Sequence, residues 1–458
     1  MFYTKEVAEQ PALTIDDLAP VIDGRGADDI AAAIAHRIRE LDAPAGTPLP
    51  TVRALAAHLG VSASTVSDAW KILRTRGMIE TDRRRGTTVR SGRSDGADRA
   101  WHVPVAPGAL ATDLSTGTPD PRLLPDLHRA LTQATAGHQV TSYLDRPVLP
   151  DLEVELRRRW PYDPERITLL DGAQDALDRL ISSTVAYGDR VIVETPTFPP
   201  ILDMLELAGA DIIGVPLDEH GLRVDALTTA LAAQPSLAIL QPRAHNPTGV
   251  AWSEQRAADL AAVFGPTNVL VIEDDHSGMV AGAPLHTTGC HRPDHTVHIH
   301  SFSKSHGPDL RLAAVGGPAS VVDRVVRRRQ LGPSWTSRLL QQVLLGLLTD
   351  PVAEAAVATA EATYGDRRRR LVEALACHGI ELVAPGSGLN VWVPVDDERD
   401  ALVALAATGI GAAPGRPFLP AAATADHIRL TISAVEDPEP IAAAVAVSAQ
   451  ATGSRAVR

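Results

Sequence analysis

The chain has 458 residues, of which 45% are hydrophobic and 22% charged, and its formal net charge is −13. At about 150 residues per domain, that length predicts two or three domains rather than one simple core. The ordinary apolar content indicates a folded globular protein, and the negative charge argues against nucleic-acid binding over the whole surface.

Two cysteines, Cys290 and Cys377, provide neither a disulfide framework nor the ligand spacing of a zinc site. Seven histidines between His276 and His306 are scattered without ligand spacing, so they predict no metal site. The N-terminus lacks the apolar stretch of a secretion signal, and no run of about 18 apolar residues marks a membrane span. We therefore expect a cytoplasmic protein that does not associate with membranes.

The first predicted elements form a small helical module. Apolar residues recur at helical spacing over residues 28–41. Thr51 is a plausible N-cap for a second short helix that Gly60 ends, and a third helix begins at residue 62. Two short helices joined at a glycine turn predict a helix-turn-helix, whose second helix can enter the major groove of DNA. Short hydroxyl side chains suited to phosphate or base contacts face outward on it: Ser62, Ser64, Thr65 and Ser67.

A basic hairpin is predicted after these helices. Residues 78–80 and 87–89 can pair as strands, and the connection between them carries Arg83, Arg84 and Arg85. The stretch from Lys71 to Arg93 holds eight basic residues against two acidic ones, which locally reverses the overall charge of the chain. A solvated helix face would produce a similar charge run. The hairpin and the helices together favour a basic wing that contacts DNA.

Residues 27–92 resemble the winged helix of the GntR family of regulators. The resemblance lies in the segment 48–56, the turn Leu59-Gly60-Val61-Ser62, the pair Thr65-Val66 and the Arg-Gly-Thr of the wing. It implies that Arg53 contacts a phosphate and that the hydroxyls of the third helix and Thr87 of the wing face DNA. The family often has an arginine where Ala63 stands, so the wing arginines would carry more of the affinity here.

Residues 93–111 have the composition of a linker, and that composition continues to Gly117. Downstream, apolar strands alternate with helical patterns, which predicts an α/β domain with a mostly parallel sheet and ligands at the carboxyl ends of its strands. The expected strands are 167–170, 190–194, 212–216, 237–240, 269–272, 297–301 and 312–315. The expected organisation is an extension (1–26), a DNA-binding domain (27–92), a linker (93–111), a large domain (112–448, with a small subdomain from about 330) and a tail (449–458).

Lys304 is the most informative residue for chemistry. The chain has three lysines, and Lys304 is the only one after Lys71. This matters because arginine can replace lysine as a charge but not as a nucleophilic amine. Lys304 follows a predicted strand between Ser301, Ser303 and Arg311, which offer hydrogen-bond donors to a phosphate. An amine beside phosphate donors predicts a Schiff base with pyridoxal phosphate. An isolated surface lysine is the alternative, so the neighbouring motifs decide.

Further motifs follow the other predicted strands. A glycine turn at 171–174 opens a helix whose amides suit a phosphate. Phe198 could stack on a heterocycle, and Asn246 stands at a tight turn. Asp274 could keep a pyridine nitrogen protonated, since an opposite charge within ~4 to 6 Å shifts a pKa by about 1 to 3 units. Taken singly, the glycine turn fits a common way to begin a helix, Phe198 fits a core-packing aromatic better than a stacking one, and turn chemistry alone can explain Asn246.

The order of these motifs over residues 112–448 resembles the fold-type I pyridoxal-phosphate enzymes, the aspartate aminotransferase superfamily. With the GntR-like head, the whole chain resembles the MocR family of transcriptional regulators. The resemblance implies that Lys304 holds the cofactor as an aldimine, Asp274 pairs with its ring nitrogen and Arg429 grips a substrate carboxylate. Phe198 would stack on the ring and Asn246 would bond its phenolic oxygen. The implied phosphate cradle consists of Gly172, Ala173, Gln174, Ser301, Ser303 and Arg311.

Two positions of the cofactor site deserve separate expectations. Tyr143 stands where the family often uses a tyrosine that reaches across a dimer interface, although Leu144 and Arg146-Pro147 replace a glycine-containing stretch beside it. His276 stands where relatives usually carry a tyrosine that bonds the phenolic oxygen. Either His276 supplies that hydrogen bond or the contact is lost.

The MocR resemblance implies a homodimer that binds paired half-sites of double-stranded DNA. Its large domain would sense an amino acid, an amine or pyridoxal phosphate itself, with a coupling of about 1 to 3 kcal/mol between the sites. A working aminotransferase with an autoregulatory DNA-binding head is the alternative, because the Lys304 amine could shuttle a proton. A DNA-binding scaffold with an empty pocket is a third possibility, against which the intact set of cofactor residues argues.

Overall fold

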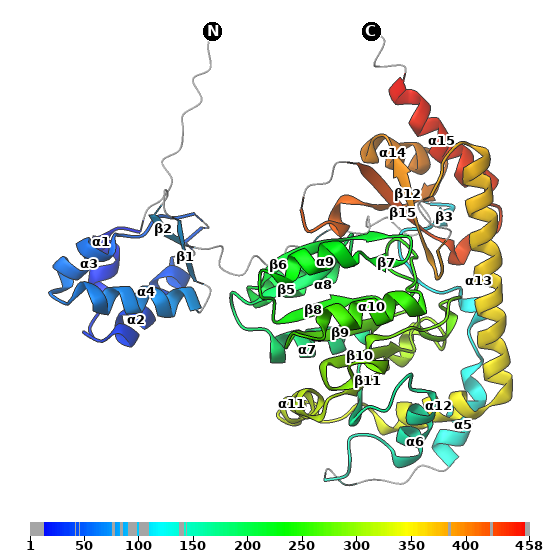
Figure 1. The fold of residues 1–458 in the computed structure, drawn as a ribbon, viewed down its shortest axis with the longest axis horizontal. Helices are drawn as coiled ribbons and strands as arrows, with labels where there is room; N and C mark the ends of the chain where they lie inside the picture. Colours follow the sequence, from blue (N-terminus) through cyan, green and yellow to red (C-terminus); the bar gives the residue numbers. More distant parts are fainter. Residues whose placement is uncertain are drawn as a thin grey trace. The chain divides into compact units, whose positions relative to one another are not determined.

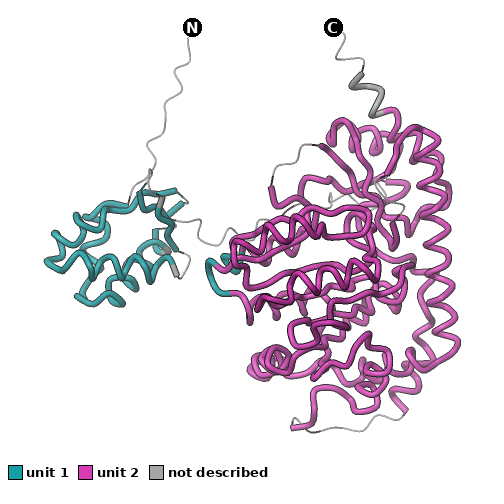
Figure 2. The backbone as a smooth tube through the Cα atoms, in the orientation of Figure 1, with its two compact units in different colours: residues 1–98, 186–188, 207–210 teal, residues 99–185, 189–206, 211–458 magenta. Residues whose placement is uncertain are grey.

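The computed structural model describes residues 13–41, 43–44, 46–75, 78–82, 86–89, 99, 110–136, 142, 144–382, 386–421 and 425–453. The chain divides into two compact units (Figure 2). The first takes Met1–Asp98, Ala186–Gly188 and Leu207–Ala210; the second takes Arg99–Val185, Asp189–Glu206 and Asp211–Arg458. Within the described residues no single helix is long and apolar enough to cross a membrane. The consecutive helices α12 (Arg338–Thr349) and α13 (Pro351–Cys377), bent by 77° at their junction, pass that test of length and composition only as a pair.

The N-terminal unit confirms the predicted helices and hairpin. Thr51 caps the second predicted helix by accepting a hydrogen bond from the Ala54 amide at 3.2 Å, and Gly60 ends that helix with a φ of 64°. Its elements are α1 Ile15–Leu18, α2 Ala27–Glu40, α3 Val52–Leu59, α4 Ala63–Thr75, β1 Ile79–Asp82 and β2 Gly86–Val89. The strands pair antiparallel from Ile79↔Val89 to Asp82↔Gly86. Residues 83–85, which carry the predicted wing arginines, lie outside the described residues.

Apolar side chains at helical spacing bury the core of this unit. Ile30 and Ile34 of α2, Leu55 of α3 and Val66 of α4 are fully buried in one cluster. Because each helix places its apolar residues on one face, the opposite faces of α3 and α4 stay in contact with solvent. The sequence pattern therefore determines which residues this unit can offer to DNA.

An eight-stranded sheet organises the large unit (Figure 1). Its strand order is β4-β11-β10-β9-β8-β5-β6-β7, and the pairs from β10 to β6 are parallel. β11 runs antiparallel to both of its neighbours. The strands are β4 Arg166–Leu170, β5 Arg190–Thr195, β6 Asp211–Asp218, β7 Gly221–Leu222, β8 Leu237–Leu240, β9 Leu270–Asp275, β10 Thr296–Ser301 and β11 Ala313–Gly317. The mostly parallel sheet that the alternating pattern predicts is thus present.

Helices pack around this sheet and form the small subdomain. Those of the large subdomain are α5 Leu127–Ala136, α6 Pro150–Arg159, α7 Ala173–Thr184, α8 Pro199–Ala208, α9 Val224–Leu231, α10 Glu254–Phe264, α11 Ala319–Gln330 and α12 Arg338–Thr349. The long helix α13, Pro351–Cys377, runs along the unit from α12 toward the small subdomain (Figure 1). The small subdomain adds β12 Asn390–Val395, α14 Glu398–Ala407, β13 Ile410–Gly411, β14 Ala413–Pro414, β15 Asp426–Thr431 and α15 Glu439–Gly453.

Two sequence interpretations are corrected by this fold. The strand expected to end at Ile272 continues as β9 to Asp275. Two of its three added carboxylates find partners inside the protein: Glu273 accepts from Thr288 at 2.7 Å, and Asp275 pairs with Arg243 at 2.8 Å. The segment up to Gly117, whose composition indicates a linker, contains β3 (Thr112–Asp113), which pairs with β13. Leu114 is buried in the core of the small subdomain, so its burial overrides the local composition.

Candidate cofactor site and DNA-binding face

Lys304 lies one turn past the carboxyl end of β10 and faces a cavity of about 180 Å³. Its ammonium donates a hydrogen bond to the carbonyl oxygen of Gly117. Burial, and then the nearby Arg429 guanidinium, lower the pKa of Lys304 to about 8. A larger fraction of this amine is therefore neutral near neutral pH than in an exposed lysine, which makes it a nucleophile.

Asp274 provides a buried carboxylate on the neighbouring strand β9. Its side chain is 2% exposed, and Oδ1 has no hydrogen-bond partner among the described residues. Burial, followed by the charges of Asp275 and Glu194, raises the pKa of Asp274 to about 7. A buried carboxylate without a partner is costly unless a cationic group meets it. The site is therefore built to receive a positively charged or protonated group.

The phosphate end of the predicted site is assembled around a helix N-terminus. Gly172 has a φ of 98° and precedes α7, whose first-turn residues Ala173 and Gln174 line the cavity. A Cβ atom on Gly172 would lie 3.4 Å from the Arg311 guanidinium carbon, so the backbone at Gly172 and the Arg311 side chain approach closely here. Helix amides, the helix dipole and a guanidinium together suit an anion.

The two predicted serines complete this end of the cavity. Ser301 and Ser303 both line it, and the amide of Ser303 donates to Ser301 Oγ at 3.3 Å. The backbone of Arg311 adopts the left-handed region, with a φ of 48°. Five of the six residues of the predicted phosphate cradle thus line the cavity, and the sixth, Gly172, directly precedes Ala173 and lies close to Arg311.

Arg429 on β15 lines the same cavity from the small subdomain and is 1% exposed. Its guanidinium donates to the carbonyl oxygen of Ser115 and, at 3.5 Å, to Asn246 Oδ1. Burial lowers the pKa of Arg429 to about 9. A buried guanidinium that lines a cavity can bind an anionic group of a ligand through charge-assisted hydrogen bonds.

His276 and Phe198 also line the cavity, as the sequence predicts. His276 Nε2 lies 3.1 Å from Ser277 Oγ, and Nδ1 is buried with no hydrogen-bond partner among the described residues. Burial, followed by the charge of Lys304, lowers the pKa of His276 to about 3, so the ring is neutral. Tyr143, predicted to act across a dimer interface, lies outside the described residues.

Several residues that line the cavity were missed by sequence reasoning: Thr116, Gly117, Ser277, Pro308, Leu389 and Asn390. Among these residues only Gly117 carried a signal in the sequence, its residue type. In the structure its φ of 67° favours glycine, and a Cβ there would lie 3.7 Å from Arg429 Nη1. The others are common residue types whose position depends on long-range packing.

The predicted DNA-binding residues separate into exposed and structural members. Arg53 on α3 and Ser64 and Ser67 on α4 are exposed. Ser62 instead caps α4, because its Oγ accepts from the Thr65 amide at 3.1 Å and lies 2.7 Å from Ser64 Oγ. A DNA phosphate would have to compete with these local hydrogen bonds.

Thr65 and Thr87 are half-buried rather than exposed. Thr65 Oγ1 lies 2.8 Å from Ser62 Oγ, and Thr87 Oγ1 lies 3.2 Å from Thr81 Oγ1 across the β1–β2 hairpin. These hydroxyls therefore help to hold the turn and the hairpin in shape.

Two family models match adjacent parts of this chain. The model described as bacterial regulatory proteins, gntR family, matches residues 26–89, and the model described as aminotransferase class I and II matches residues 111–447. The vitamin B6 salvage pathway transcriptional repressor PtsJ of Salmonella typhimurium is 34% identical over 429 residues, covering 92% of this chain and 97% of that protein. The HTH-type transcriptional regulator TauR of Rhodobacter capsulatus is 27% identical, covering 88% and 93%.

Solved aminotransferases share the fold of the large unit. Aspartate aminotransferase from Thermus thermophilus with maleate aligns with a TM-score of 0.64 at 22% identity, covering 72% of this chain and 89% of that one. Kynurenine aminotransferase from Pyrococcus horikoshii aligns with a TM-score of 0.67 at 21% identity, covering 79% and 97%. The resemblance to these enzymes is one of fold.

Proposed function

The chain belongs to the MocR-like regulators, in which a GntR-type winged helix is joined to an aminotransferase class I and II domain, and from that premise we propose that it regulates transcription by sensing a small amine. The winged helix binds operator DNA. The large unit binds the effector, and an amino acid is the class that its cavity suits best.

The residues of the cavity fit pyridoxal phosphate, which the aminotransferase domain implies. When bound, this cofactor supplies an aldehyde that captures amines and a ring that withdraws electrons. Lys304 would hold the aldehyde, and the unpartnered Oδ1 of Asp274 would accept a hydrogen bond from the protonated ring nitrogen. Asn246 and His276 would contact the phenolic oxygen, and Phe198 would cover the ring. The phosphate would lie at the N-terminus of α7.

One observation carries the sensing proposal: the segment that directly follows the linker contacts both charged groups of the site. Gly117 O accepts from Lys304, and Ser115 O accepts from Arg429. A cofactor aldehyde held by Lys304 and an effector carboxylate held by Arg429 would each compete with one of these carbonyl oxygens, and an effector amine that replaced Lys304 on the cofactor would release the lysine to Gly117 O again. Effector binding would therefore change the contacts of the segment 115–117, which leads through the linker to the winged helix. Such a change would couple the effector site to the DNA-binding site by a free energy.

Arg429 provides the sharpest test of the effector class. In Arg429→Gln, the protein should lose its preference for alanine over ethylamine, which lacks the carboxylate. The preference should fall by about 10- to 100-fold, the effect of one charge-assisted hydrogen bond. Cofactor absorbance during titration gives the affinities, and fluorescence anisotropy of labelled operator DNA gives the response.

Arg416→Gln serves as the matched control, because Arg416 is exposed and pairs with Asp426 on the surface. It should keep the preference for alanine. An Arg429→Gln protein that still prefers alanine would remove Arg429 from effector recognition. A protein that binds alanine but never changes its affinity for DNA would contradict the sensing role.

A working aminotransferase is the second candidate, and the lowered pKa of Lys304 favours it. An amine with a pKa of about 8 can both donate and accept a proton near neutral pH. Sustained release of keto acid from an amino acid in the presence of a keto-acid acceptor would establish turnover. A single spectral change without turnover would support sensing alone.

The oligomeric state and the operator geometry belong to the same proposal. We expect a homodimer whose two winged helices bind paired half-sites, since symmetric dimers match symmetric operators. Sedimentation of the protein with a DNA fragment that carries one or two half-sites measures both quantities. Equal affinity of a monomer for either fragment would contradict this arrangement.

A further inference from the structure

A second cavity of about 400 Å³ lies in the large unit beside the cofactor site. Its walls include His298, His300 and Phe302, from β10 and the residue just after it. Alternate residues of a strand face opposite sides of the sheet, so this cavity and Lys304 use the same strand end from different sides. Its volume falls within the roughly 300–1,000 Å³ of small-molecule sites.

The charged groups of this cavity are already neutralised by protein partners. Arg243 donates to both carboxylate oxygens of Asp275, at 3.0 and 2.8 Å, and to the Ala283 carbonyl oxygen at 3.0 Å. Arg159 pairs with Glu155 and Glu354. Both guanidinium groups on the cavity wall are therefore already paired with carboxylates, and a negatively charged ligand would gain little binding free energy from them.

His298 and Trp160 are the exceptions among the polar groups of the wall, because His298 Nε2 and Trp160 Nε1 are both buried without a hydrogen-bond partner among the described residues. The His298 side chain is fully buried, and its Nδ1 lies 3.2 Å from Glu273 Oε2. Glu273 also accepts from the amide and hydroxyl of Thr288 and so remains an acceptor, which places the ring proton on Nδ1. Nε2 then has a free lone pair and no hydrogen-bond partner among the described residues. A buried acceptor in this state needs a donor.

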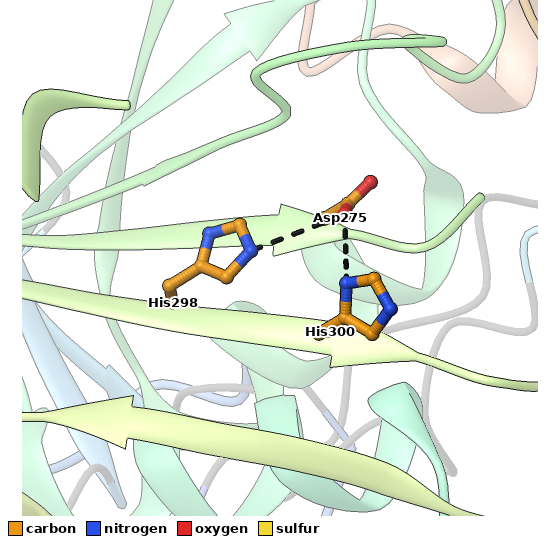
Figure 3. Close-up of side chains that lie close together, drawn as sticks. All are labelled: Asp275, His298 and His300. Carbon is orange, nitrogen blue, oxygen red and sulfur yellow. Dashed lines mark hydrogen bonds and ion pairs between the residues drawn. The ribbon is translucent and has the colours of Figure 1, made fainter. Parts of the chain in front are cut away.

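Three side chains near this cavity could together hold a metal ion. Figure 3 shows Asp275 of β9 between His298 and His300 of β10, and one ligand atom of each lies within 4.8 Å of the others. His300 Nδ1 is 3.1 Å and His298 Nε2 is 3.9 Å from Asp275 Oδ2. A cation at this point would lie beside the fixed charge of Arg243 and would displace the His300 proton. These two costs argue against a metal.

The remaining walls are apolar and aromatic. They consist of Leu156, Trp160, Pro161, Met279, Leu285 and Phe302. The Trp160 ring lies edge-on to the His298 ring, with centroids 5.5 Å apart. Flat apolar walls with a buried acceptor at His298 and a buried donor at Trp160 Nε1 match a flat apolar molecule that carries an O–H or N–H donor.

We propose that this cavity binds a small uncharged aromatic molecule of the phenol or indole class, whose O–H or N–H group donates to His298 Nε2. The bound ring would pack against Phe302, which lies between Ser301 and Ser303 of the cofactor cavity. A ligand here would therefore contact the strand end that carries Lys304. The binding itself requires neither DNA nor an amine effector, so it stands apart from the sensing proposal.

Ligand-observed NMR on the full-length protein tests this inference with four probes. Phenol should bind, and anisole, which has the same ring but no donor, should bind about tenfold more weakly. Benzoate and zinc chloride should not compete with phenol. Equal binding of phenol and anisole, or displacement of phenol by benzoate or zinc, would overturn the proposal.

Two variants of the cavity and one control variant locate the site without relying on one substitution. His298→Phe removes the acceptor but leaves Glu273 without its histidine, so it can also unfold the protein. Leu285→Trp keeps His298 and fills the cavity from its half-buried wall, and it should abolish phenol binding. Leu339→Trp places the same new ring at an exposed position of α12 and should leave phenol binding unchanged. Phenol binding that survives Leu285→Trp would refute the assignment.

Discussion

The DNA-binding face and the cofactor cavity are built in opposite ways. Arg53, Ser64 and Ser67 are exposed neighbours on two consecutive helices, and the same short segment that folds locally also presents them. The cavity joins residues as distant as Thr116 and Arg429, and it buries charge. Surface recognition can therefore be encoded locally, whereas buried chemistry depends on the whole sheet and the small subdomain.

The difference also appears in the acid–base properties of the cavity. Burial raises the pKa of Asp274 to about 7 and lowers those of Lys304 and Arg429 to about 8 and 9. Removal from water disfavours the charged form of every group, and neighbouring charges then set how far each pKa moves. Perturbed groups of this kind gather where a protein does chemistry.

Substitution of Lys304 and, separately, of Lys71 tests most sharply whether the cofactor cavity and the DNA-binding face are independent. Lys304→Ala should abolish the absorbance of the lysine-bound cofactor completely while basal DNA affinity stays largely intact, because Lys304 and the winged helix belong to different units. Lys71→Ala, on the exposed side of α4, should leave that absorbance unchanged. Absorbance spectra and operator binding of both variants provide the measurement. Loss of DNA binding in Lys304→Ala would show that the units do not function separately.

A cavity in the winged-helix core should have the next largest effect. Leu55 is fully buried among α2, α3 and α4, so Leu55→Ala should lower the free energy of unfolding of this unit by about 2–5 kcal/mol. Operator binding should weaken while the cofactor absorbance keeps its own thermal transition. Thermal melts followed at the cofactor band and by operator binding measure this. A single shared transition would mean that the units unfold together.

The pH dependence of cofactor uptake reports the buried amine. With a pKa of about 8, Lys304 is charged below that pH and neutral above it, and only the neutral amine attacks an aldehyde. The uptake rate of the apoprotein should rise about tenfold from pH 7 to the plateau above 8. Stopped-flow absorbance measures this rate. A rate that keeps rising to pH 10 would indicate an amine with the ordinary pKa of lysine.

The smallest effect is expected at the wing. Arg84→Ala should weaken binding to all DNA sequences alike and reduce the slope of affinity against salt by about one unit, as loss of one phosphate contact does. Titrations of specific and random DNA over a range of salt concentrations measure both quantities. An unchanged slope would remove this arginine from the interface, and a loss confined to the operator would indicate a base contact.

Local patterns predicted those elements whose structure is set by nearby residues. Thr51, Gly60 and the apolar spacing around Leu55 were sufficient for α3 and its cap, because capping and amphipathicity act within a few residues. The strands of the large unit were found in the same way. Asp275 and Leu114 were misread, because an ion pair with Arg243 and burial in the small subdomain override the local pattern.

The sequence by itself determined the modular order, the winged helix, the mostly parallel sheet and the candidate residues Lys304, Asp274 and Arg429. Only the tertiary structure decided that Ser115 contacts Arg429 and that Gly117 contacts Lys304. It alone also decided that His298 retains an unpartnered acceptor beside a second cavity. The physical reason is range. Periodicity and capping are local properties of the chain, whereas burial, and with it the pKa of each charged group, arises when distant segments exclude water together.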